Sequence, residues 1–235
     1  NMGYAFYDCI CLVNAPVISP NVVSMLATFH GCHNLINAPV IPEKVTDLRF
    51  AFTLCTNLVN APVISSNVTS MSGTFESCFN LINAPVIPAN VTDMSNAFYN
   101  CRNLINAPII PANVTNMYGT FFDCTNLINA PIIPVNVSDL TYTFAGCKNL
   151  VNAPNISSGI TGMVNTYRDC MRLSNNVSIP DTVKYLRETF SSCVSLVNAP
   201  VIPANVTVMV GTFSDCQGLT GNIIIKSNRI NNTSM

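Results

Sequence analysis

Apolar and polar positions repeat along this chain with a fixed period of 23 residues. The segment MSNAFYNCRNLINAPIIPANVTN begins at Met94, and the same pattern begins again at Met117, 23 residues later. No insertion or deletion interrupts this register. Periods between about 20 and 50 residues are typical of solenoids, in which each unit packs mainly on its neighbours. We therefore predict one elongated repeat domain, whose units begin at Met2, Met25, Leu48, Met71, Met94, Met117, Leu140, Met163, Leu186 and Met209.

Each unit contains two stretches with different periodicity. The second stretch, LINAPII, is short, apolar and β-branched, and it predicts a short parallel strand around Ala107 to Ile110. The prolines of this stretch cannot continue a helix, so they end the first stretch. In that first stretch, apolar residues three or four positions apart predict about three helical turns: Val91, Met94, Phe98, Cys101 and Leu104.

These elements predict an α/β repeat solenoid. Stacked strands lie about 4.8 Å apart, whereas packed helices need about 8 to 10 Å. The helical side should therefore splay, which places the parallel strands on the concave side and the helical turns on the convex side. We assign residues 1–221 to the solenoid and residues 222–235 to a terminal strand followed by a polar cap or tail. Because the chain starts in phase without a capping unit, we expect a longer array or a neighbouring chain that covers the first unit.

The composition narrows the range of partners. Charged residues make up 9% of the chain and the net charge is −1. No basic or acidic run is present, so neither nucleic acid nor an anionic membrane is indicated. The apolar runs are cut by Pro and Asn and are too short to span a bilayer, so we expect no membrane insertion. A near-neutral surface of amides and hydroxyls favours association, including end-to-end self-association of copies.

One cysteine recurs at the same position of every unit, and Cys11 is the remaining one of the 11 cysteines. On a splayed helical side, neighbouring cysteines would exceed the roughly 7 Å Cα separation that a disulfide tolerates. We therefore predict a ladder of buried free thiols, with Cys11 either exposed or paired. The asparagines of the Asn-Ala-Pro motif, from Asn14 to Asn198, are predicted to form a second ladder that hydrogen-bonds between units.

The sequence offers no constellation for catalysis or metal binding. Its two histidines, His30 and His33, lie beside Cys32, but zinc requires a fourth ligand and a fitting geometry. No glycine-rich phosphate loop, activated nucleophile or isolated carboxylate pair stands out from the repeat. We predict a protein that is not an enzyme and needs no cofactor.

The segment NVTDMSNAFYNCRNL, from Asn90 to Leu104, resembles the BspA-like leucine-rich-repeat surface proteins of bacteria and some protists. Their unit has the form N-V-T-x-M-x-x-x-F-x-x-C-x-x-L, and the likeness covers nearly all of the chain. It departs in the NAPVIP segment, where the family more often has a longer Leu/Ser/Asp stretch. The resemblance implies a leucine-rich-repeat solenoid with an extracellular or cell-surface role in binding or adhesion. It carries over no catalytic or ligand residues to this sequence.

The units differ from one another mainly on the predicted helical side, whereas the NAP side is nearly constant. One hypothesis is a binding module for a host or neighbouring-cell surface protein or glycan, with the constant side as a uniform ladder for a repetitive ligand or a defined patch between Tyr142 and Arg187. The other is a structural spacer or fibre element of an extracellular filament or phage tail. The residues predicted to bind a partner are Tyr142, Lys148, Arg168, Arg172 and Arg187.

Overall fold

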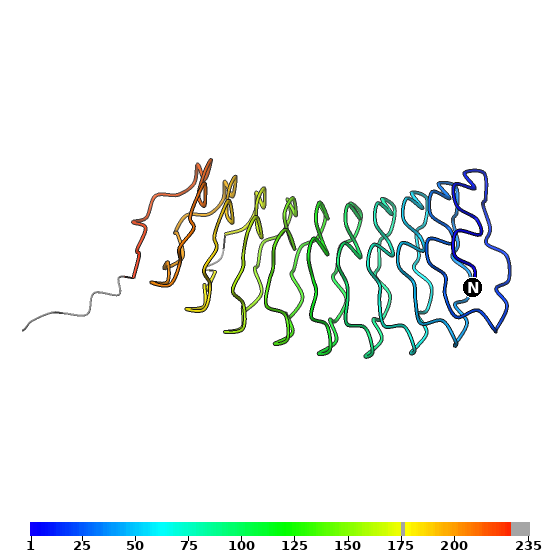
Figure 1. The fold of residues 1–235 in the computed structure, drawn as a ribbon. Coiled ribbons are helices and arrows are strands. Elements are labelled where there is room, and N and C mark those ends of the chain that lie inside the picture. Colours follow the sequence, from blue (N-terminus) through cyan, green and yellow to red (C-terminus); the bar gives the residue numbers. More distant parts are fainter. Residues whose placement is uncertain (175–176, 227–235) are drawn as a thin grey trace, which may run out of the picture.

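The computed structural model describes residues 1–174 and 177–226. Figure 1 shows the chain wound into rungs that stand side by side in one row, with a gentle fan along its length. Each rung is one 23-residue unit. Within the described residues the backbone forms no helix and no continuous strand, and none of its segments is a helix long and apolar enough to cross a membrane. The predicted polar tail, from residue 227 onward, lies outside the described residues.

Neighbouring rungs are joined by isolated parallel β-bridges, most of which run in two rows along the array, and one further bridge joins Ile202 to Ile225. One row joins the asparagines of the Asn-Ala-Pro motif from Asn14 to Asn152. The other joins the residues that precede the Met/Leu position, from Ser24 to Asn116 and from Asp139 to Val208. The strand predicted around Ala107 to Ile110 is therefore misplaced, because the bridges form at Asn106 and Asn116. Pro108 lies within the predicted strand and lacks the amide hydrogen that a ladder requires.

The helical turns predicted on one side of the solenoid are wrong. The segment that follows Met94 is a series of tight turns, in which Asn96 and Asn100 have left-handed backbones with φ of 53° and 60°. A right-handed helix cannot contain such residues. The turns close through bonds three residues apart, such as Cys101 N–H to the Phe98 carbonyl at 3.1 Å. These turns return every third or fourth side chain to the interior, which explains why the apolar spacing resembles that of a helix.

The same turns also bind the next rung. The amides of Asn96 and Phe98 donate to the carbonyls of Tyr118 and Thr120 at 2.8 and 2.9 Å, and the pattern recurs along the array. Rungs are therefore hydrogen-bonded to each other on the turn side as well as at the bridges. The wide helix spacing that supported a convex helical side and a concave strand side is absent, which agrees with the gentle fan in Figure 1.

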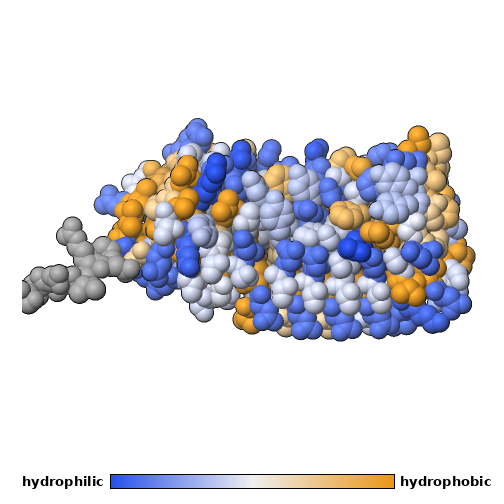
Figure 2. All heavy atoms as spheres, in the orientation of Figure 1, coloured by the Kyte–Doolittle hydropathy of each residue, from blue (hydrophilic) through white to orange (hydrophobic). Residues whose placement is uncertain are grey.

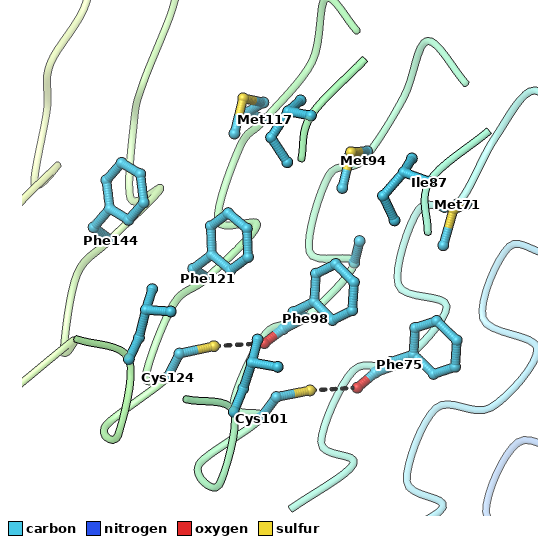
Figure 3. Close-up of a cluster of buried hydrophobic side chains, with 14 of the residues drawn as sticks. Met71, Phe75, Ile87, Met94, Phe98, Cys101, Met117, Phe121, Cys124 and Phe144 are labelled. Carbon is cyan, nitrogen blue, oxygen red and sulfur yellow. Dashed lines mark hydrogen bonds between the residues drawn. The ribbon is translucent and has the colours of Figure 1, made fainter. Parts of the chain in front are cut away.

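The core consists of ladders of identical side chains that run through the rungs. Phenylalanine rings stack from rung to rung with centroids 5.7 Å apart for Phe75–Phe98 and Phe98–Phe121, and Figure 3 shows this row beside the methionines. Tyr167 continues the stack in the irregular eighth unit, at 5.8 Å from Phe144. The units that begin at Met25 through Leu186 thus bury an equivalent set of Met/Leu, Phe/Tyr, Cys and Leu side chains, whereas the first and last units are only partly buried.

The predicted ladder of buried free thiols is confirmed from Cys32 to Cys193, whereas Cys216 is half-buried. The thiol of Cys101 donates to the carbonyl of Phe75 in the preceding rung at 3.0 Å, as Figure 3 shows. Cys11 is exposed as expected, but Cys9, the first member of the ladder, is exposed as well. The thiols are therefore hydrogen-bond donors between rungs.

Asparagine ladders exist, but the best-formed one is not the ladder predicted from the Asn-Ala-Pro motif. In that motif the backbones form bridges, and one amide–amide bond joins the side chains of Asn152 and Asn129 at 3.3 Å. The asparagines two positions after the ladder cysteine instead form five consecutive amide–amide bonds of 3.3 to 3.5 Å, from Asn34 to Asn149. Figure 2 shows regular rows of hydrophilic side chains along the array on the face in view.

Candidate functional site

The side chains that differ between units gather on the turn side of the array. We call this surface the turn face, and it consists of the first and second residues after Met/Leu and the first residue after Phe/Tyr. At most of these positions the side chain is exposed or partly exposed, although several, such as Ala27, Ala145 and Asn165, are buried. Contacts between neighbouring rungs make the face continuous, as at Tyr7 and His30, whose rings stack with centroids 4.5 Å apart.

Aromatic rings from three successive rungs surround a hollow of about 280 Å³ on this face. The rings of Tyr99 and Phe122 lie parallel, with centroids 4.6 Å apart. The ring of Tyr142 approaches Phe122 at 6.0 Å and meets Tyr118 edge-on at 5.8 Å. We call this site the aromatic hollow, and its lining residues are Asn96, Tyr99, Tyr118, Gly119, Phe122 and Tyr142.

Gly119 is one of the residues that line the aromatic hollow. Its backbone is left-handed, with φ of +57°, and a Cβ at this position would collide with the side-chain oxygen of Asn96. The absence of a side chain lets the Asn96 amide and the rings of Tyr118 and Tyr142 border a common space. The hollow therefore offers aromatic faces for apolar groups and an amide for hydrogen bonding.

Burial and neighbouring carboxylates keep the phenol of Tyr99 protonated. Desolvation raises its pKa above the ordinary value, and Asp123 and Glu76 raise it further. Its hydroxyl therefore remains a donor as well as an acceptor at neutral pH.

The structure brings two of the predicted binding residues together on the two rungs that follow Tyr142. Arg168 and Arg187 both approach the carboxylate of Glu188, at 3.3 and 3.7 Å. Arg168 also lies 3.4 Å from Asp169. All four side chains are at least 30% exposed, so these ion pairs hold the arginines in place without removing them from solvent.

The other three predicted residues are distributed around this pair. Tyr142 belongs to the aromatic hollow. Lys148 and Arg172 lie on neighbouring rungs just after the ladder cysteines, are exposed, and are joined by a 3.2 Å bond from the Arg172 amide to the Lys148 carbonyl. Among the contacts of the described residues, none joins the ring of Tyr142 to the predicted cations. Of the rings that line the hollow, the sequence predicted only Tyr142 as a binding residue and missed Tyr99, Tyr118 and Phe122, although Tyr99 and Phe122 occupy equivalent positions in consecutive units.

A second exposed surface lies on the Asn-Ala-Pro side. The residue after the proline is Val or Ile in each of the first six units, and its exposed fraction is between 87% and 99%. Shallow hollows of about 360, 460 and 420 Å³ lie between successive rungs and are lined mainly by Ala, Pro, Val and Ile. We call this surface the aliphatic ladder, and it consists of Val17, Val40, Val63, Val86, Ile109 and Ile132.

The described residues contain no group of three or more His, Cys, Asp or Glu side chains that could hold a metal ion. His30 stacks on Tyr7 and lies 3.9 Å from Asp8.

Stacked 23-residue rungs with ladders of Leu, Phe and Cys define a leucine-rich-repeat-like solenoid. The sequence pattern known as the BspA type leucine rich repeat region, in six copies, matches residues 2–104, 26–151 and 140–234. Because these matches together span nearly the whole chain, the chain belongs to the BspA-type leucine-rich-repeat family.

One solved structure supports the same fold. A leucine-rich repeat protein from Bacteroides ovatus superimposes on 93% of this chain with a TM-score of 0.72 and 22% sequence identity. This chain covers 64% of the length of that protein. At this identity the likeness concerns the fold alone. No curated protein matches the chain.

Proposed function

We propose that the chain is a non-catalytic repeat domain that binds a protein or glycan on a host or neighbouring cell, and that it acts outside the cell or at the cell surface. Membership of the BspA-type family supports a binding repeat. The single observation that carries the proposal is the aromatic hollow, because aromatic rings concentrate on the face where the units differ. Tyr and Arg are the side chains that contribute most at binding interfaces.

The binding surface extends from the aromatic hollow to the arginine pair. Tyr118 is 47% exposed, so its ring is open to a partner while its edge is held by Tyr142. The neighbouring ion pairs orient Arg168 and Arg187, which reduces the side-chain entropy lost on binding. Lys148 and Arg172 lie at the edge of this surface and contribute mainly to the rate of association.

The test is a glycan and extracellular-matrix protein array, probed with the intact chain and with a form that lacks two central units. A saturable signal for one ligand class, lost on deletion, is the expected result. A blank array would remove the support for a binding function. It would favour the second candidate, a structural spacer or fibre element, which is supported by the near-constant rungs from Met25 to Asn136.

Point variants then locate the site. Tyr118→Ala together with Tyr142→Ala should weaken binding by roughly thirtyfold or more, which corresponds to about 2 kcal/mol. The matched control is Tyr185→Ala, because Tyr185 is 46% exposed and lies outside the aromatic hollow. Equal affinity of the double variant and the control would place binding elsewhere on the molecule.

A further inference from the structure

The aliphatic ladder is a surface that folding alone does not explain. Ile109 is 90% exposed and Val63 is 89% exposed, so neither side chain gains much from burial within its own chain. The β-branched shape suits an extended backbone, but Thr has the same shape and no unit uses it here.

Two later units show that the rung does not need an aliphatic residue at this position. The equivalent residues are Asn155 in the seventh unit and Ser178 in the eighth, and both are exposed. Ile179, the neighbour of Ser178, remains buried, and Ile156, the neighbour of Asn155, is partly buried and packs against the core, so these rungs keep their core. The stability of the rungs therefore does not explain the six consecutive Val and Ile residues, which points to a contact with another molecule.

The charge of this surface permits close contact with a copy of itself. From the Leu that precedes the Asn-Ala-Pro motif to the Val that follows it, the first six units contain only two ionisable side chains, Glu43 and Lys44. These have opposite charge. Two such surfaces can therefore face each other without like-charge repulsion or the desolvation of unpaired ions.

The shape of the surface is also self-complementary. Ridges of Val and Ile border hollows between the first and second, the third and fourth, and the fourth and fifth rungs. A second copy shifted by half a rung would place its ridges in these hollows. A polysaccharide would find no hydrogen-bonding side chain on the ridges, and a single peptide strand would not repeat across all six rungs.

The available area is sufficient for a specific contact. Six rungs at about 4.8 Å and five extended residues at about 3.3 Å give a patch of roughly 29 by 16 Å. Two facing patches bury roughly 900 Å² before their corrugation is counted. This is close to the roughly 1,000 Å² that a specific interface requires.

We propose that the aliphatic ladder is a homotypic interface through which two copies of this chain pair side by side. The pairing is independent of the proposed function, because the ladder and the aromatic hollow are made by different segments of each unit. It leaves the turn face of both copies open, so a pair would present two binding surfaces and gain avidity for a multivalent partner.

Sedimentation velocity of the intact chain, from about 1 to about 100 µM, tests this pairing. The wild type should form dimers. Val63→Lys together with Ile109→Lys should weaken dimerisation by at least about a hundredfold, since like charges then face each other. The matched control is Val210→Lys, because Val210 is 64% exposed and lies on the turn face. Circular dichroism and thermal melts establish that all three proteins are folded.

Two results would overturn the proposal. If the wild type stays monomeric over this concentration range, the aliphatic ladder does not pair two copies of the chain. A double lysine variant that associates as strongly as the wild type would place self-association elsewhere, as in an open-ended series of end-to-end oligomers.

Discussion

At the scale of single residues, the core side chains stabilise the contact between rungs as well as the rung itself. The ring of Phe98 is fully buried between Phe75 and Phe121. Phe98→Ala should lower the free energy of unfolding by about 3 to 5 kcal/mol, because it leaves a cavity in a continuous stack. Urea denaturation followed by circular dichroism measures this. A loss below about 1 kcal/mol would mean that the stack is not close-packed.

The buried thiols make a second prediction at this scale. Burial, the nearby Cys9 and Asp8 raise the pKa of Cys32 to about 11, against an ordinary value of 9.0. At pH 8 about one Cys32 thiol in a thousand is therefore ionised, and the fully buried thiols, such as Cys101, have pKa values raised still further. A maleimide reagent should label Cys9 and Cys11 rapidly in the native protein and all cysteines only after unfolding. Rapid native labelling of the whole set would contradict the ladder.

The sign of the pH effect follows from the same shift. A folded-state pKa above the unfolded value means that the protein binds more protons when folded once the pH exceeds 9. The contribution of Cys32 to stability is therefore complete below pH 9 and is lost progressively as the pH rises toward 11. Thermal midpoints should fall over this window.

At the scale of elements, the left-handed positions are what turn each unit into stacked turns. They occur at the second and sixth residues after Met/Leu, as at Gly119 and Asp123. Two such residues per unit prevent the backbone from forming a helix. They also orient every second amide of the turns to donate a hydrogen bond to a carbonyl of the next rung. Glycine is not required at every rung, because most units place a residue with a side chain there at a modest cost.

Gly119→Ala tests this element. The variant should be less stable by about 1 to 3 kcal/mol, because it places a side chain on a left-handed backbone and against Asn96. Gly211→Ala is the matched control, since Gly211 has a similar φ of +63°, but the atom nearest to a Cβ there lies 3.2 Å away, which is farther than the Asn96 oxygen lies from a Cβ at Gly119. Urea denaturation of both should show the larger loss for Gly119→Ala, and equal losses would contradict the overlap with Asn96.

Some of this organisation could be predicted from the sequence and some could not. The period, the buried cysteines and the solenoid follow from the register of residues such as Met94 and Cys101. The helix prediction was wrong because tight turns at Asn96 and Asn100 return side chains inward with nearly helical spacing. The aromatic hollow was only partly predicted, through Tyr142, because its remaining rings come together across rungs at positions that vary from unit to unit.

At the scale of the whole molecule, the array should tolerate removal of a complete unit. Deleting the 23 residues Met71–Asp93 keeps every core ladder in phase and shortens the array by about 4.8 Å. The variant should retain cooperative unfolding and a wild-type circular dichroism spectrum. Deleting only Leu81–Val91 should abolish the fold, because later rungs would then lose their register with the earlier ones. Equal behaviour of the two deletions would contradict the stacked-rung account.

The central claim is that the molecule divides its surface, with partner binding on the turn face and self-association on the aliphatic ladder. The most direct measurement is calorimetric titration of a ligand identified on the array, compared between three proteins: the wild type, Tyr118→Ala with Tyr142→Ala, and Val63→Lys with Ile109→Lys. The account predicts that the tyrosine variant loses at least roughly thirtyfold in affinity, whereas the lysine variant keeps the wild-type affinity per chain. Loss of affinity in the lysine variant with retention in the tyrosine variant would contradict it and assign partner binding to the ladder.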